Sequence, residues 1–127
     1  MRLNSLEPNA HYDVVNGRPL AIERDNDGST IVRFNITEET EVPEGKKKAE
    51  LVGYNCREIR IWNAPTKANI KRAFIRSVID ESAEFDLVNS YNKHILAIRQ
   101  DDAAVEAYKE FLAFTEDVDA AILEMLN

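Results

Sequence analysis

The sequence predicts an α+β domain with an N-terminal antiparallel sheet and a C-terminal set of helices. Strand-like alternation of apolar and polar residues stops near Trp62, and helical periodicity begins near Thr66. Strands that precede helices without intermixing are typical of this class. A chain of 127 residues is long enough for one hydrophobic core. We therefore predict a single domain, 1–127, with a sheet half over 1–62 and a helical half over 66–127.

Three or four strands form the predicted N-terminal β-meander. Residues 11–15 and 20–24 flank Asn16-Gly17, a dipeptide that favours a tight hairpin because both central turn positions need a positive φ. After a second turn rich in Asp and Gly, residues 30–36 alternate apolar and polar side chains. The polar stretch 37–48 is interpreted as an exposed connection.

The longest predicted strand covers residues 49–62. Tyr54 shares one face of this strand with its apolar neighbours, whereas Ile59 and Ile61 have the opposite parity. A regular strand would turn one of these sets to water. We therefore predict a β-bulge or a strong twist near Arg57.

Three helices are predicted after Pro65, and Thr66 is a suitable N-cap for the first. The apolar residues of this helix lie on two sides, one with Phe74 and the other with Ile75 and Ile79. A helix with two apolar sides must be covered twice. We expect it to lie between the sheet and other helices, or against another subunit.

The last two helices are predicted to form an antiparallel hairpin, because the connection between them is short. Asp80 or Ser82 caps the first of the two, which ends near Arg99. The other follows an N-cap at Asp101 or Asp102 and runs almost to the C-terminus. The apolar stripe expected to pack the hairpin includes Leu87, Val88, Tyr91, Ile95 and Ile98.

Charge is distributed unevenly along the chain. Of the net charge of −7, residues 81–127 contribute −8, from three basic and eleven acidic residues, so residues 1–80 carry +1. An acidic C-terminal half does not favour nucleic acid as a partner there. It favours solubility and a basic protein partner.

The sequence indicates no catalytic residue, no cofactor-binding site and no metal site. Residues 23–28 resemble the start of an EF-hand loop, but the position of its bidentate acid is Phe34. His11 and His94 lie in different halves, and neither has a second ligand at metal-binding spacing. Motifs for phosphate binding or an activated nucleophile do not occur. We expect a protein without enzymatic activity or cofactor.

The sequence also predicts a cytoplasmic protein without membrane association. No run approaches the ~20 apolar residues of a membrane span, and the first eight residues lack the apolar core of a signal peptide. The single cysteine, Cys56, is typical of a small buried residue in a reducing compartment.

A basic and aromatic cluster surrounds the first predicted helix. Its members are Tyr54, Arg57, Arg60, Trp62, Lys67, Lys71, Arg72 and Arg76. One interpretation is a phosphate-binding stripe with aromatic stacking. The other is that these cations neutralise the acidic helices within the fold or across a subunit interface, and the charge of the C-terminal half favours it.

The stretch from Val52 to Trp62, followed by Pro65-Thr66 and an Ile-rich helix, resembles a group of small uncharacterised proteins encoded in phage and prophage genomes of gut bacteria. The resemblance covers about the middle third of the chain. It implies a non-enzymatic, phage-related protein near tail or virion assembly genes. It assigns no site residue.

These observations favour a non-enzymatic protein-interaction or assembly module that binds a protein partner or self-associates. The candidate interaction residues are Tyr54, Trp62, Arg60, Lys67, Lys71, Arg76, Ile75 and Ile79. The alternative is a nucleic-acid-associated regulatory protein that uses the basic cluster around the first helix. A small enzyme with a pocket between sheet and helices is the least favoured hypothesis.

Overall fold

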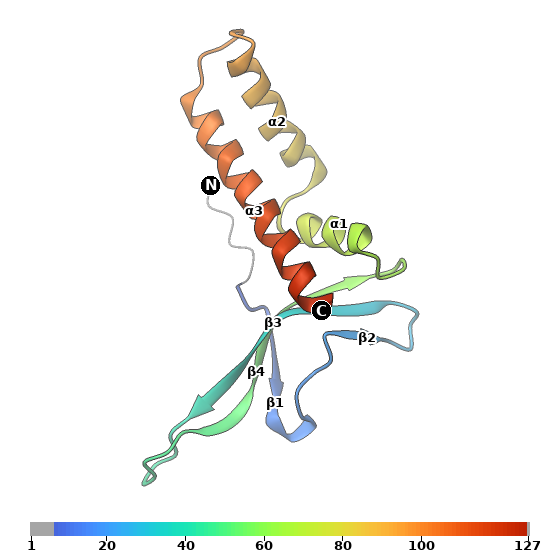
Figure 1. The fold of residues 1–127 in the computed structure, drawn as a ribbon, viewed down its shortest axis with the longest axis vertical. Coiled ribbons are helices and arrows are strands. Elements are labelled where there is room, and N and C mark those ends of the chain that lie inside the picture. Colours follow the sequence, from blue (N-terminus) through green and yellow to red (C-terminus); the bar gives the residue numbers. More distant parts are fainter. Residues whose placement is uncertain (1–6, 127) are drawn as a thin grey trace.

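The computed structural model describes residues 7–126, which form a four-stranded antiparallel sheet followed by three helices (Figure 1). The strands are β1 (Ala10–Asp13), β2 (Ile22–Arg24), β3 (Thr30–Glu41) and β4 (Glu50–Ile61). The helices are α1 (Lys67–Val78), α2 (Glu81–Ile95) and α3 (Asp102–Leu126). The predicted α+β class, with strands before helices, is confirmed.

The strand order is β1-β4-β3-β2, so β2, β3 and β4 form a meander and β1 pairs with β4. The predicted hairpin across Asn16-Gly17 is therefore wrong. Of these two residues only Gly17 has a positive φ, 75°, so the tight turn that needs two such residues is not formed. Instead, a single 3-10 turn, η1 (Val14–Asn16), ends at Gly17. The chain then crosses to the other edge of the sheet.

A bulge does occur at the level of Arg57, but on the neighbouring strand. The step from Phe34 to Thr37 on β3 faces the shorter step from Arg57 to Asn55 on β4, so β3 carries the additional residue. Asn35 lies at this point with a φ of 52°, and Asn tolerates the left-handed region better than most residues. The irregularity therefore turns the Asn35 side chain out of the regular strand alternation.

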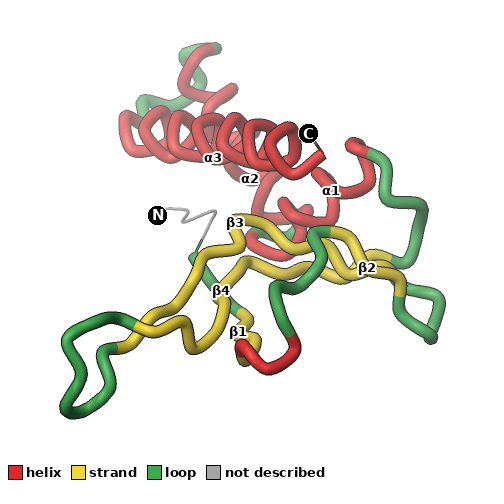
Figure 2. Tube along the Cα trace, turned by 60° about the horizontal axis from the view of Figure 1, so that its bottom comes forward, coloured by secondary structure: helices red, strands yellow, loops and turns green. Residues whose placement is uncertain are grey.

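The main core lies between the sheet and the helices, which lie on one side of the sheet (Figure 2). Its buried members are Val32, Phe34, Ile59, Ile61, Ile70, Phe74, Ile79, Phe111, Phe114, Val118 and Ile122. Phe74 meets Phe34 edge-on, with ring centroids 4.8 Å apart, a favoured arrangement for aromatic pairs. Thr66 caps α1 as predicted, because its side chain accepts a hydrogen bond from the N–H of Asn69 at 3.2 Å.

The other face of the sheet is closed by a charged cluster centred on Arg33, which is only 4% exposed. Its Nε donates to Glu58 Oε1 at 3.0 Å and to the Tyr12 hydroxyl at 3.1 Å, and its Nη2 donates to Glu23 Oε1 at 3.2 Å. Burial lowers the pKa of Arg33, but these hydrogen bonds outweigh it and the pKa is raised. The segment between β1 and β2 covers this face, since Arg33 Nη1 also donates to the Leu20 carbonyl at 2.9 Å.

Burial on both faces explains the two apolar parities of β4. Ile59 and Ile61 belong to the helix-side core. Tyr54 and Cys56 are also buried, in the part of β4 that pairs with β1. The change of parity between Cys56 and Ile59 therefore needs no extra residue on β4, because both sets of side chains are buried.

Helices α2 and α3 form the predicted hairpin, which extends away from the sheet (Figure 1). The rings of Tyr91 and Tyr108 stack between the two helices with centroids 4.6 Å apart. Helix α2 contains no fully buried residue. The hairpin therefore leaves much of α2 in contact with solvent.

Candidate functional site

The basic residues of α1 are partly neutralised by the acidic helices. Lys71 Nζ lies 2.8 Å from Asp119 Oδ1 of α3, and Arg76 Nη1 lies 3.1 Å from Glu84 Oε1 of α2. These pairs are as expected if the cations neutralise the helices within the fold. Because all four side chains are partly exposed, each pair contributes little to stability.

Arg60 is held at the turn between β2 and β3. Its Nη1 lies 2.8 Å from Asp25 Oδ2 and 3.3 Å from Asp27 Oδ2. The Ser29 hydroxyl and backbone N–H both donate to Asp27 Oδ1, at 2.6 and 2.9 Å, and this lowers the pKa of Asp27. Two carboxylates therefore compete with any external anion for the Arg60 guanidinium.

A small part of the predicted cluster remains open. Trp62 is 68% exposed and lines a shallow groove of about 260 Å³ together with Arg60, Arg72 and Arg76. Within residues 7–126, neither Lys67 nor Arg72 forms an ion pair. Tyr54 is not part of this groove, since it is eight residues along the strand from Trp62, about 26 Å at 3.3 Å per residue.

Ile75 and Ile79 do not form an open apolar surface. Ile79 is buried in the core, and Ile75 packs against the core while lining a groove with Lys71, Arg76 and Glu84. Helix α1 contacts both β4 and α3. The second apolar side of α1 is thus covered largely by the chain itself.

Of the large exposed apolar side chains, Val15, Leu20, Val42 and Trp62 lie in the sheet half, and the others lie on the helical hairpin. Phe85 is 55% exposed, Ile95 57%, Leu96 69% and Ile98 71%. The expected packing of Ile95 and Ile98 against α3 is wrong, because α2 ends at Ile95 and the chain reverses at Ala97, whose φ is 58°. Large apolar residues at a chain reversal are unusual, since turns are mostly polar.

This reversal, the tip of the hairpin (residues 93–101), is fixed by hydrogen bonds. The Ile98 N–H donates to the Lys93 carbonyl at 2.9 Å, and the Ala97 N–H donates to the His94 carbonyl at 3.1 Å. These two bonds define a Schellman motif, with Ala97 at the position that glycine usually occupies. The tip therefore holds its apolar side chains in a defined arrangement.

The second half of the tip is equally fixed. The Asp101 N–H donates to His94 Nδ1 at 3.0 Å, which connects the end of α2 to the start of α3. Asp101 Oδ1 accepts a hydrogen bond from the Ala104 N–H at 3.0 Å, so Asp101 caps α3 as predicted. A surface that is ordered before binding loses less entropy when it binds.

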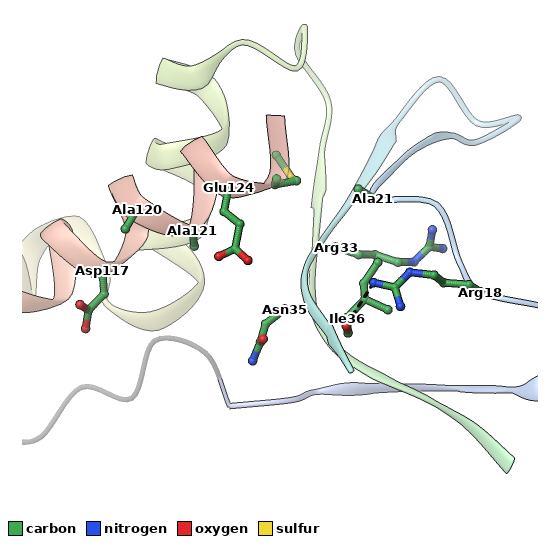
Figure 3. A pocket seen from close by; sticks show the side chains of 10 residues that line it. Arg18, Ala21, Arg33, Asn35, Ile36, Asp117, Ala120, Ala121 and Glu124 are labelled. Atoms are coloured by element: carbon green, nitrogen blue, oxygen red, sulfur yellow. Dashed lines mark hydrogen bonds between the residues drawn. The ribbon is translucent and has the colours of Figure 1, made fainter. Parts of the chain in front are cut away.

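A cleft of about 510 Å³ lies between α3 and the bulge of β3 (Figure 3). Asn35 and Glu124 point into it, with Asp117 further along the same helix. Arg18 lies beside the cleft and donates to the Ile36 carbonyl at 3.3 Å. The charged side chains of the lining are those of Arg18, Arg33, Asp117 and Glu124.

Comparisons with known proteins add no relative: no protein-family model, curated protein or solved structure matches the chain. Over the described range 7–126, no helix is both long and apolar enough to cross a membrane. The same residues contain no group of three His, Cys, Asp or Glu side chains that could hold a metal ion. The exposed surfaces of the fold are therefore the basis for a functional proposal.

Proposed function

We propose that this protein is a non-enzymatic interaction module of a protein assembly, and that it self-associates through its α2–α3 hairpin. The observation that carries this proposal is a set of four large apolar residues on α2 and the hairpin tip, each more than half exposed: Phe85, Ile95, Leu96 and Ile98. Burial of such a side chain is favourable by about 1.5–3 kcal/mol. Gathered apolar residues on a soluble protein are typical of interaction sites.

The architecture supports the same proposal. Two helices alone bury little surface, and α2 contains no fully buried residue. Helical hairpins are commonly completed as four-helix bundles, in which each helix has two neighbours. The resemblance of residues 52–62 to phage and prophage proteins favours a role in phage-related assembly.

The test is the solution mass by light scattering over a wide range of concentrations and at two salt levels. We expect the wild-type mass to rise above the 14.5 kDa of one chain as concentration increases. Ile95→Gln should shift this rise to higher concentration. Val15→Gln is the matched control, because Val15 is 85% exposed but lies in η1, away from the hairpin. A wild-type protein of monomeric mass at every concentration would overturn the proposal.

One observation favours a second function, a nucleic-acid-associated regulator. Trp62 is exposed beside Arg72, which lacks an ion-pair partner among residues 7–126. An exposed aromatic ring next to a free cation suits single-stranded nucleic acid. Pairing of Arg60, Lys71 and Arg76 within the chain leaves this function in second place.

Trp62 is the only tryptophan in the chain, so its fluorescence reports directly on this groove. Titration with single-stranded DNA and RNA oligonucleotides should quench the emission at low salt and lose this effect at high salt. Arg72→Gln should weaken the binding, whereas Lys93→Gln, a cation on the hairpin, should not. Unchanged fluorescence at low salt, with no retention of the oligonucleotides, would exclude the function.

A further inference from the structure

We propose that self-association occurs by antiparallel pairing of α2 with α2 of a second copy, with the two-fold axis crossing the seam midway between Val88 and Asn92. The proposal rests on the proposed function and specifies its geometry. Its basis is an apolar seam on α2 that the fold leaves uncovered, together with the order of charges along the same helix.

The seam consists of Phe85, Val88, Asn92 and Ile95. Their spacing of three, four and three residues places them on one face of the helix, as in a coiled-coil seam. Phe85, Asn92 and Ile95 are exposed, and Val88 is half-buried. A different set of positions, including Leu87 and Tyr91, packs toward the core and α3.

The seam fits a second copy of itself in one antiparallel register. With the axis at position 90, Phe85 of one copy faces Ile95 of the other, and Val88 faces Asn92. Each large exposed side chain at one end of the seam thus meets a large apolar side chain. The polar Asn92 falls next to the axis, where a single polar seam residue fixes register at some cost in stability.

Charges along α2 favour the antiparallel orientation over the parallel one. Glu81 lies in the first turn of α2, whereas Lys93 lies in its last turn. Antiparallel pairing brings the acidic end of one α2 to the basic end of the other, and it also opposes the helix dipoles. Parallel pairing would bring like charges together at both ends.

The arrangement also separates the most acidic parts of the two copies. Glu116, Asp117 and Glu124 lie in the half of α3 that packs near the sheet. In an antiparallel pair the two sheets point in opposite directions, so these acidic segments lie at opposite ends of the dimer. Repulsion between the two copies of segment 81–127, each with a charge of −8, is thereby reduced.

Disulfide cross-linking tests this register. Val88→Cys and Asn92→Cys chains are prepared separately in the full-length protein, and each is oxidised mildly alone and in an equal mixture. We expect a disulfide-linked dimer on a non-reducing gel in the mixture only. In the antiparallel register, residue 88 faces 92 of the second copy. By contrast, residue 88 of one copy and residue 88 of the other are offset by about 6 Å along the helix axis. Because the two helix axes are also about 8–10 Å apart, these two residues are too far apart for a disulfide.

Two controls accompany the experiment. Wild-type protein should not cross-link, because Cys56 is fully buried and burial raises the pKa of its thiol. A mixture of Val15→Cys and Asn92→Cys chains measures cross-linking by random collision, since Val15 is exposed in η1. It should give no dimer beyond a trace.

The possible results distinguish a wrong α2–α2 register from a protein that does not self-associate. A dimer in the Val88→Cys and Asn92→Cys mixture alone supports the proposal. Cross-linking of either variant by itself identifies a parallel pair and overturns the antiparallel register. A wild-type mass above the monomer without the cross-link in the mixture overturns the α2 pairing and leaves the proposed function in place. A monomeric mass overturns both.

Discussion

Replacement of Ala97 by glycine should stabilise the protein. Ala97 occupies the left-handed position of the Schellman motif at the hairpin tip, with a φ of 58°. A residue with a Cβ in this conformation costs about 1–2 kcal/mol, and glycine removes that cost. Against this gain, glycine adds about 0.4–1 kcal/mol of conformational entropy to the unfolded chain. The net expectation is an increase of about 0.5–1 kcal/mol in the free energy of unfolding.

Urea denaturation followed by far-UV circular dichroism measures this change for Ala97→Gly. For a chain of this size the gain corresponds to an increase of about 2–4 °C in Tm. Self-association should be unchanged, because the substitution keeps the tip hydrogen bonds and the α2 seam. Loss of stability in Ala97→Gly would refute the assignment of the motif.

A control variant gives the opposite sign. Ala113 is exposed within α3, where the backbone is helical and glycine has no conformational advantage. Ala113→Gly should lower the free energy of unfolding by about 1 kcal/mol. Equal effects of the two substitutions would mean that Ala97 is not strained.

Three further predictions concern the sheet. Gly53→Ala should loosen the pairing of β1 with β4, because the added Cβ would lie 2.6 Å from the Tyr12 carbonyl oxygen; hydrogen exchange should become faster in β1. Arg33→Met should lower the free energy of unfolding in urea by about 2–3 kcal/mol, because Met cannot replace the hydrogen bonds that the buried guanidinium donates to Glu23, Glu58 and Tyr12. The pKa of Asp27 is lowered in the folded state by the hydrogen bonds from Ser29, so its stabilising contribution is complete above the unfolded pKa of about 3.9 and is lost as pH falls further.

Each of these predictions has its own control. Slower or unchanged exchange in β1 of Gly53→Ala would contradict the close approach. Lys71→Met removes an exposed pair and should cost at most about 1 kcal/mol, and a similar value for Arg33→Met would contradict the role of burial. In Asp27→Asn the corresponding part of the acid dependence should be absent, and persistence of the full dependence would assign it to other groups.

Much of the fold follows from local signals in the sequence. The N-caps at Thr66 and Asp101 depend on neighbouring residues, which a sequence displays directly. The partner of β1 could not be predicted in this way. Asn16-Gly17 permits a hairpin, but pairing with β4 satisfies the backbone of β1 over a much longer separation. The residues of a turn do not indicate which distant strand will pair with β1.

The candidate surface was less accessible to sequence analysis. Apolar residues in α2 predict packing, yet periodicity does not tell how far the core extends along a helix. Ile95 and Ile98 lie beyond the end of the hydrophobic core, so their side chains remain exposed to solvent. The 3-4-3 spacing that begins at Phe85 is the signal that separates the exposed seam from the face packed on α3. Conversely, Ile79 looked available for an interface, although the core covers it.

The pairing of β1 with β4 has a consequence for synthesis of the protein. Ala10 pairs with Cys56, so β1 leaves the ribosome well before its partner strand. At about 5–20 residues per second, the intervening segment takes roughly 2–9 s to appear. During this interval β2 and β3 can already form their local hairpin, whereas β1 has no strand to join. β1 can therefore join the sheet only after β2 and β3 are able to pair, and the edge that β1 forms is completed only after residues 53–56 of β4 have been synthesised.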